Sequence, residues 1–216
     1  INQLATALAL VKSPENKELQ VSILANLGYL CAILNESSTG EEETKSHRQN
    51  CERGALCYID EGLQLAQGND VLTALMLISR GNIFALNKEP LQALAVYRQA
   101  AQRAERAGKV QLLSKALNNA ATITLELEDR DATQSEAFLT QTVAQLKQLP
   151  DSHDKVYALL SCGVLARQLD GPANWQRAYD FFQQARQIAR RLLDKRAESY
   201  TVGYLGELYE ATQRLS

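Results

Sequence analysis

The residues best suited to chemistry in this chain are two histidines, four cysteines and a cluster of glutamates. His47 and Cys51 are four positions apart, a spacing that places two metal ligands on one face of a helix. Only Cys57 offers a third strong ligand nearby, because His153 is far along the chain. The surrounding segment 35–50 is rich in Ser, Gly and Glu and has no apolar side chain, which favours a mobile loop over a metal site. We expect no metal and no cofactor.

Catalytic motifs are absent from the sequence. There is no HExxH, no GxSxG, no phosphate-binding loop and no GxGxxG after a strand. Neither histidine has a Ser or Cys placed to form a nucleophile–base pair. The acidic cluster of Glu126, Glu128 and Asp129 falls at a helix end and is typical of a solvated surface. The sequence therefore predicts a protein that is not an enzyme.

Composition narrows the class of partner. The 216 residues carry a formal net charge of −2 and are 45% hydrophobic, so the chain has no general attraction for nucleic acid. No run of 18 apolar residues exists, and no membrane insertion is expected. The basic run 185–196 reads as a solvated helix face, with a phosphate or acidic-partner patch as the alternative. Reduced cysteines would suit a cytoplasmic location; a disulfide from Cys31 to Cys51 or Cys57 is the alternative.

A repeat organises the whole chain. Five apolar segments each place a small residue at their fourth position, and these recur every 40 to 43 residues after a first interval of 53. The longer interval holds the 35–50 insertion. The small residues are Gly28, Gly81, Ala121, Gly163 and Gly206.

Each of the first four small residues precedes a second helical segment with its own signature at offsets +4 and +7. The clearest are Ala93, Tyr97 and Ala100. Small residues let two antiparallel helices approach closely, and an aromatic side chain then fills the gap beside them. The corresponding sets in the other repeats are Ala178, Phe182 and Ala185; Ala55, Ile59 and Gly62; and Ala137, Gln141 and Ala144.

Leu27–Gly28, Leu205–Gly206–Tyr209 and the set Gly81, Phe84, Ala93, Tyr97, Ala100 resemble the tetratricopeptide repeat (TPR). This resemblance implies an all-α, right-handed superhelical array of antiparallel helix pairs. The chain then starts and ends with half a repeat, as expected of the middle of a longer array. The expected parts are 1–14 as a trailing helix, repeats at 17–68 (with the inserted loop 35–50), 71–107, 111–149 and 153–194, and a first helix at 196–216.

In the TPR family the first helix of each repeat lines a concave groove. Carried over by position, the expected partner-binding residues are Tyr29, Ile33, Leu75, Ile78, Asn82, Asn118, Thr122, Tyr157, Arg167, Tyr200 and Glu207. One Lys and one Arg opposed by three Glu do not make a carboxylate clamp. An apolar helix or extended peptide fits this groove better. Trp175 is expected to pack at the start of a second helix, with a binding hot spot as the alternative.

These observations predict a non-catalytic scaffold that binds a peptide or helix of a partner protein. The stretch 198–216 and the repeat period also look like cyanobacterial proteins in which TPR repeats precede a caspase-like CHAT protease domain. That resemblance implies a regulatory or sensor segment for a protease domain located outside these residues. Self-association through open ends of the array is a third alternative.

Overall fold

The computed structural model describes residues 1–11, 13–36, 54–127, 132–169 and 171–213, and every regular element in those ranges is helical. The predicted all-α class is confirmed. The elements are α1 (Asn2–Leu10), the short 3-10 helix η1 (Pro14–Asn16), α2 (Lys17–Glu36), α4 (Ala55–Leu65), α5 (Asp70–Leu86), α6 (Pro90–Arg106), α7 (Val110–Glu126), α8 (Ala132–Leu146), α9 (His153–Gln168), α10 (Pro172–Arg191) and α11 (Lys195–Gln213).

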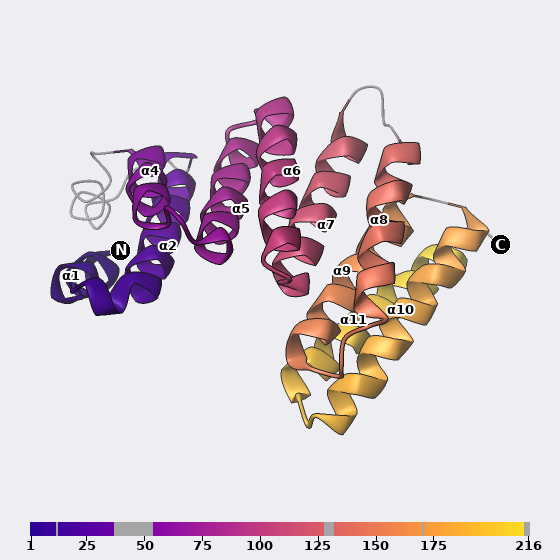
Figure 1. The fold of residues 1–216 in the computed structure, drawn as a ribbon. Coiled ribbons are helices and arrows are strands. Elements are labelled where there is room, and N and C mark those ends of the chain that lie inside the picture. Colours follow the sequence, from indigo (N-terminus) through magenta and orange to yellow (C-terminus); the bar gives the residue numbers. More distant parts are fainter. Residues whose placement is uncertain (12, 37–53, 128–131, 170, 214–216) are drawn as a thin grey trace. The chain divides into compact units, whose positions relative to one another are not determined.

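The chain divides into two compact units, residues 1–112 and 113–216. In the first unit α2 packs on α4 and α5 packs on α6; in the second α9 packs on α10, and α10 packs on α11. The helix pairs α5–α6 and α9–α10 each run antiparallel (Figure 1). This sequential packing is that of a helical-repeat protein. The repeat boundaries given above stay a prediction.

Local signals in the sequence set where the helices begin. The side chain of Asn69 accepts hydrogen bonds from the backbone N–H groups of Val71 and Leu72 at the start of α5. Ser152 does the same for Lys155 at the start of α9. Pro90 and Pro172 occupy the first turns of α6 and α10, where a missing backbone N–H costs nothing.

Three of the recurring small residues lie where two helices cross. A Cβ added to Gly81 would meet three ring atoms of Tyr97 at less than 3.0 Å, and one added to Gly163 would meet three of Phe182. A Cβ on Gly28 would lie 2.9 Å from Cδ1 of Ile59. Glycine is therefore required at positions 81 and 163 for the second helix to sit where it does, and the contact at Gly28 is less tight.

The predicted face of the helix after Ala121 is wrong. Ala137, Gln141 and Ala144 are all exposed on α8. The buried set is instead Ser135, Leu139 and Thr142, which keeps the +4 and +7 offsets but starts two residues earlier. Ser135 can replace alanine there because its hydroxyl donates a hydrogen bond of 3.1 Å to the carbonyl of Ala121.

Each unit has its own apolar core. The first is built around Leu24, Leu27, Ile59 and Met76, and the second around Leu139, Leu165, Phe182 and Ile188. No helix in the described ranges is long and apolar enough to cross a membrane.

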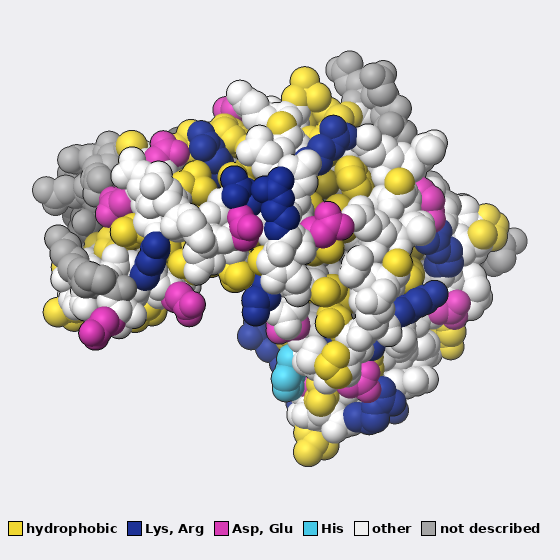
Figure 2. Space-filling view, viewed as in Figure 1, with side chains coloured by type: hydrophobic (Ala, Val, Ile, Leu, Met, Phe, Trp, Pro, Cys, Tyr) yellow, Lys and Arg dark blue, Asp and Glu magenta, His cyan; other side chains and the backbone are white. Residues whose placement is uncertain are grey.

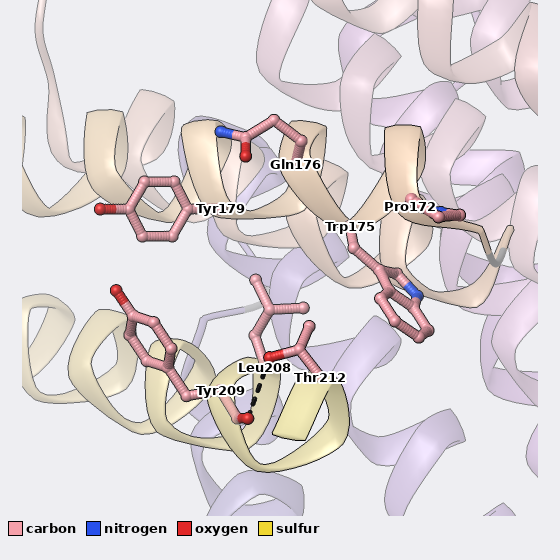
Figure 3. Close-up of a pocket in the computed structure, with 7 residues that line it drawn as sticks. All are labelled: Pro172, Trp175, Gln176, Tyr179, Leu208, Tyr209 and Thr212. Atoms are coloured by element: carbon pink, nitrogen blue, oxygen red, sulfur yellow. Dashed lines mark hydrogen bonds between the residues drawn. The ribbon is translucent and has the colours of Figure 1, made fainter. Parts of the chain in front are cut away.

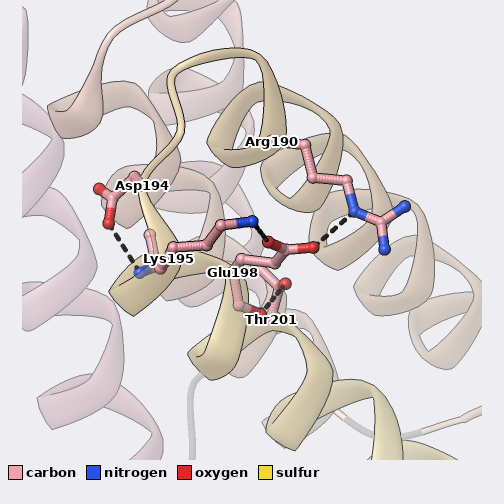
Figure 4. A network of polar contacts seen from close by, with 6 residues as sticks. Arg190, Asp194, Lys195, Glu198 and Thr201 are labelled. Atoms are coloured by element: carbon pink, nitrogen blue, oxygen red, sulfur yellow. Dashed lines mark hydrogen bonds and ion pairs between the residues drawn. The ribbon is translucent and has the colours of Figure 1, made fainter.

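A polar network fixes the start of α11 against α10 (Figure 4). The Asp194 carboxylate accepts a hydrogen bond of 2.9 Å from the backbone N–H of Ala197. Glu198 accepts from Arg190 at 2.6 Å and from Lys195 at 3.2 Å. These donors hold the pKa of both carboxyls below its ordinary value, chiefly through Ala197 for Asp194 and through Arg190 for Glu198. The network positions the helix that carries two of the expected binding residues.

Candidate functional site

The expected binding residues of the first unit lie on α2 and α5. Tyr29 is exposed on α2, whereas Ile33 and Leu75 are half-buried. Ile78 is buried in the helix packing. The Asn82 side chain is held by the Tyr97 hydroxyl, which donates to its Oδ1 at 2.7 Å. Of these five residues, Tyr29 offers the largest free surface.

In the second unit, two expected binding residues form an exposed aromatic pair. Tyr157 of α9 and Tyr200 of α11 are 38% and 44% exposed, and their rings meet edge to face with centroids 6.4 Å apart. The guanidinium of Arg196 lies over the Tyr200 ring at 5.8 Å from its centroid. We call Tyr157, Arg196 and Tyr200 the tyrosine surface. It presents two amphipathic rings and one cation to solvent.

A second pairing joins the same two helices. Arg167 of α9 donates to Glu207 of α11 at 2.6 Å, so these two expected binding residues neutralise one another. Among the described residues Arg196 has no carboxylate within ion-pair distance, and its pKa is raised mainly by its hydrogen bonds to the Tyr200 hydroxyl. Arg196 is therefore the cation at this surface that remains available to an anionic partner group.

The expected binding residue Asn118 lies on α7 with only 6% of its surface exposed. Neither the oxygen nor the nitrogen of its amide has a hydrogen-bond partner in the described structure, nor does the hydroxyl of Ser114 one turn earlier. The thiol of Cys162 on α9 faces this amide, and burial raises the pKa of that thiol to about 12. Thr122, one turn later, donates to the Asn118 carbonyl at 3.1 Å.

Unpaired buried amides are rare in folded proteins, and leaving one unsatisfied costs about 1–3 kcal/mol. Asn118 is too buried to contact a partner, so its amide belongs to the packing beside Cys162 and not to an exposed binding surface. The repeat register predicted Asn118 as a binding residue. It did not predict that the hydroxyl of Ser114 would be unpaired.

A cavity of about 420 Å³ lies between α10 and α11 and was not expected from the sequence. Aromatic side chains dominate its wall, and Tyr179 and Tyr209 meet edge to face with centroids 6.2 Å apart (Figure 3). Trp175 is the residue of this wall that the sequence indicated as an alternative binding hot spot. The lining residues are Pro172, Trp175, Gln176, Tyr179, Leu208, Tyr209 and Thr212.

The residues considered for metal binding are mostly beyond the described ranges. His47 and Cys51 fall outside them, Cys57 is an exposed free thiol, and His153 is hydrogen-bonded to Asp194 at 2.7 Å. In the ranges that the structure describes, no three His, Cys, Asp or Glu side chains are grouped to hold a metal ion. Cys31 is disulfide-bonded, as in the alternative left open above, whereas Cys57 and Cys162 are free thiols as expected.

Charge on the visible face of each unit is mixed in sign. Basic and acidic side chains are interspersed, with apolar side chains between them (Figure 2). Ion pairs such as Arg103–Asp70 and Arg177–Glu136, both 2.8 Å long, tie neighbouring helices together. Part of the basic charge is therefore committed to ion pairs within the fold.

No known family model matches the sequence, and no curated protein is similar to it. Among solved structures the chain is similar to BtubC (BKLC) from P. vanneervenii, with a TM-score of 0.56 and 14% identity. The alignment covers 98% of this chain and 90% of that one. At this level of identity the similarity supports the helical fold and carries no statement about function.

Proposed function

We propose that this protein is a non-catalytic interaction scaffold of the TPR type, which binds a peptide or helix of a partner protein on the groove-side helices. The observation that carries the proposal is the tyrosine surface of Tyr157, Arg196 and Tyr200. Two large rings stay exposed on helices whose other apolar side chains, such as Leu159 and Leu205, are buried. Tyrosine and arginine are the residue types most enriched where binding energy concentrates in protein interfaces.

The chemistry of this surface suggests the kind of segment it would bind. Tyr157 and Tyr200 would contact apolar side chains of the partner, and their hydroxyls would hydrogen-bond to its backbone. Because Arg167 is paired with Glu207, Arg196 is the group left to bind a carboxylate. We therefore propose a helix or extended peptide with an apolar centre and an acidic residue at one end.

An affinity capture experiment tests this proposal. The full chain is immobilised and incubated with lysate of the source cell, and the retained proteins are compared with those retained by Tyr157→Ala/Tyr200→Ala. The control is Leu91→Ala/Leu193→Ala, which removes two apolar side chains elsewhere that are more exposed than the tyrosines, at 70% and 77%. A partner retained by wild type and control but lost by the tyrosine variant supports the proposal. Equal retention by all three contradicts it.

The resemblance to proteins that carry a CHAT protease domain leads to a narrower form of the proposal, in which the scaffold holds or gates such a domain. It rests on the sequence pattern of residues 198–216 and on the repeat period. Sequencing the complete gene tests it directly, since a following domain with catalytic His and Cys is expected. A cytoplasmic location is part of the same proposal, although the disulfide at Cys31 favours an oxidising compartment.

A further inference from the structure

The cavity between α10 and α11 is walled by aromatic rings from both helices. Trp175 and Tyr179 come from α10, whereas Leu208 and Tyr209 come from α11 on the opposite side (Figure 3). Trp175 precedes Tyr179 by one helical turn, so the two rings lie on the same side of α10. The cavity volume of about 420 Å³ is typical of a site for a small molecule or a single side chain. The cavity shares no residue with the tyrosine surface.

Two of these rings stand nearly at right angles to one another. The planes of Tyr179 and Tyr209 meet at 74°, with the ring centroids 6.2 Å apart. Perpendicular rings form a corner in which a ligand contacts the face of at least one of them. Because the face of an aromatic ring carries the negative part of its quadrupole, such a corner attracts positive charge.

Hydrogen-bond donors around the cavity are already used within the protein. The amide nitrogen of Gln176 donates to Asp180 at 3.0 Å, and the hydroxyl of Thr212 donates to the carbonyl of Tyr209 at 3.0 Å. In the described structure no Lys or Arg lines the cavity. An anionic ligand would therefore find few donors here and no opposite charge.

A carboxylate beside the cavity favours a ligand of positive charge. Asp180 directly follows Tyr179, is exposed, and accepts the hydrogen bond from Gln176 of the cavity wall. Because an amide is neutral, this bond leaves the charge of Asp180 uncompensated. Among the described residues no Lys or Arg forms an ion pair with Asp180. The charge closest in sequence to the aromatic wall is thus negative, and it adds to the attraction of the ring faces.

We propose that this cavity binds a trimethylammonium group. Aromatic rings recognise such a group because its methyl groups share the positive charge and need no hydrogen-bond acceptor. A primary ammonium would have to satisfy three N–H donors, which ring faces do not do. Trp175, Tyr179 and Tyr209 contact the methyl groups, and Asp180 supplies the compensating charge. A free small molecule such as choline and a trimethyllysine side chain are the two sources of this chemistry.

Trp175 is the only tryptophan of the chain, so its fluorescence reports on the cavity directly. Choline chloride is titrated into the full protein at constant ionic strength, and calorimetry measures the binding heat in parallel. We expect a saturable change in Trp175 emission. The control ligand is dimethylbutanol, the neutral analogue of choline with carbon in place of nitrogen, which should bind about tenfold more weakly or worse. Equal affinities overturn the proposal, because the cavity would then accept any apolar group.

Variants of one ring separate its aromatic face from its bulk. Tyr209→Phe keeps the ring and should bind choline within about threefold of wild type, whereas Tyr209→Leu should weaken binding by about fivefold or more. Asp180→Asn should weaken it by about twofold or more. Leu193→Ala, at the other end of α10, should leave it unchanged, and circular dichroism checks that all variants are folded. Equal binding by Tyr209→Phe and Tyr209→Leu overturns the proposal.

A second ligand distinguishes the two sources of the group. An acetylated trimethyllysine amide is titrated in the same way as choline. Tighter binding of the lysine derivative assigns the site to a methylated protein segment, and tighter binding of choline assigns it to a free small molecule. If neither ligand gives a saturable signal in fluorescence or calorimetry, the proposal is overturned.

Discussion

Gly163 and Phe182 are in such close contact that a Cβ on the glycine would lie less than 3.0 Å from three atoms of the phenylalanine ring. The ring is fully buried and cannot move aside. The packing of α10 on α9 therefore requires a residue at position 163 that has a hydrogen atom in place of a side-chain methyl group. The same close contact between Gly81 and Tyr97 positions α6 on α5.

Adding a methyl group at Gly163 is expected to destabilise the protein, because the core must shift to accept it. Gly163→Ala should lower the free energy of unfolding by about 1–3 kcal/mol. Gly206→Ala is the matched control, since its Cβ meets nothing within 4 Å. In a helix interior it should be neutral or stabilising by up to about 1 kcal/mol. Urea unfolding of the two variants measures both values, and equal losses would contradict the crossing geometry.

The corrected register of α8 makes a second comparison possible. Leu139 is fully buried, so Leu139→Ala should cost about 2–5 kcal/mol of unfolding free energy. Gln141 is exposed two residues later, and Gln141→Ala should change stability by less than about 0.5 kcal/mol. If Gln141→Ala proved as damaging as Leu139→Ala, the face expected from the sequence would be the buried one after all.

Cys57 and Cys162, the thiols that are free in the described ranges, differ in reactivity for a physical reason. Cys57 is exposed, whereas burial raises the pKa of Cys162 to about 12, which leaves almost no thiolate at neutral pH. A thiol reagent at pH 8 is expected to modify Cys57 rapidly and Cys162 only after unfolding. Peptide mass spectrometry after timed labelling distinguishes the two sites. Rapid modification of Cys162 in the folded protein would place it outside the core.

Acid should weaken the α10–α11 joint. The pKa of Asp194 is depressed by the Ala197 backbone N–H and then by His153, below an ordinary value of 3.8. A depressed carboxyl pKa gives stability that is present above the ordinary value and lost as pH falls through the lowered one. Asp194→Asn keeps an amide oxygen for the cap but does not titrate. The Tm advantage of wild type over this variant should be present at pH 5 and shrink below about pH 4.

Glu198 provides a check on that interpretation. Its pKa is lowered chiefly by Arg190 and then by Lys195, so its contribution should also disappear in acid. Glu198→Gln should show the same shrinking difference in Tm. A wild-type advantage that persisted unchanged to pH 2.5 in both variants would mean that these carboxylates stabilise the joint without titrating, contrary to the account.

The sequence predicted helix pairs correctly where the repeat has a glycine on the first helix and an aromatic residue facing it on the second. Glycine at 81 and 163 with Tyr97 and Phe182 marked two helix pairs, because few other residues satisfy that contact. It misled at α8, where Ser135 and Thr142 take the places of alanine and Leu139 that of the aromatic residue. Hydroxyl residues carry no packing signal in a sequence until their hydrogen bonds are known.

The pairing of side chains between helices was beyond reach of the sequence. The repeat register named Tyr157, Arg167, Tyr200 and Glu207 as groove residues. That Arg167 neutralises Glu207 across 40 positions, leaving Arg196 as the available cation, depends on how α9 packs against α11. The cavity beside Trp175 arises in the same way, from two helices that meet only in three dimensions.

Site-specific photo-crosslinking tests the central claim, that the tyrosine surface binds a partner, most directly. The photoreactive residue p-benzoylphenylalanine replaces Tyr200 in one variant and the exposed Leu91 in another, and both are irradiated in the source cell. The account predicts a discrete adduct to one protein from position 200, lost when Tyr157→Ala is added, and none from position 91. Adducts of equal yield at both positions, or at position 91 alone, would contradict it.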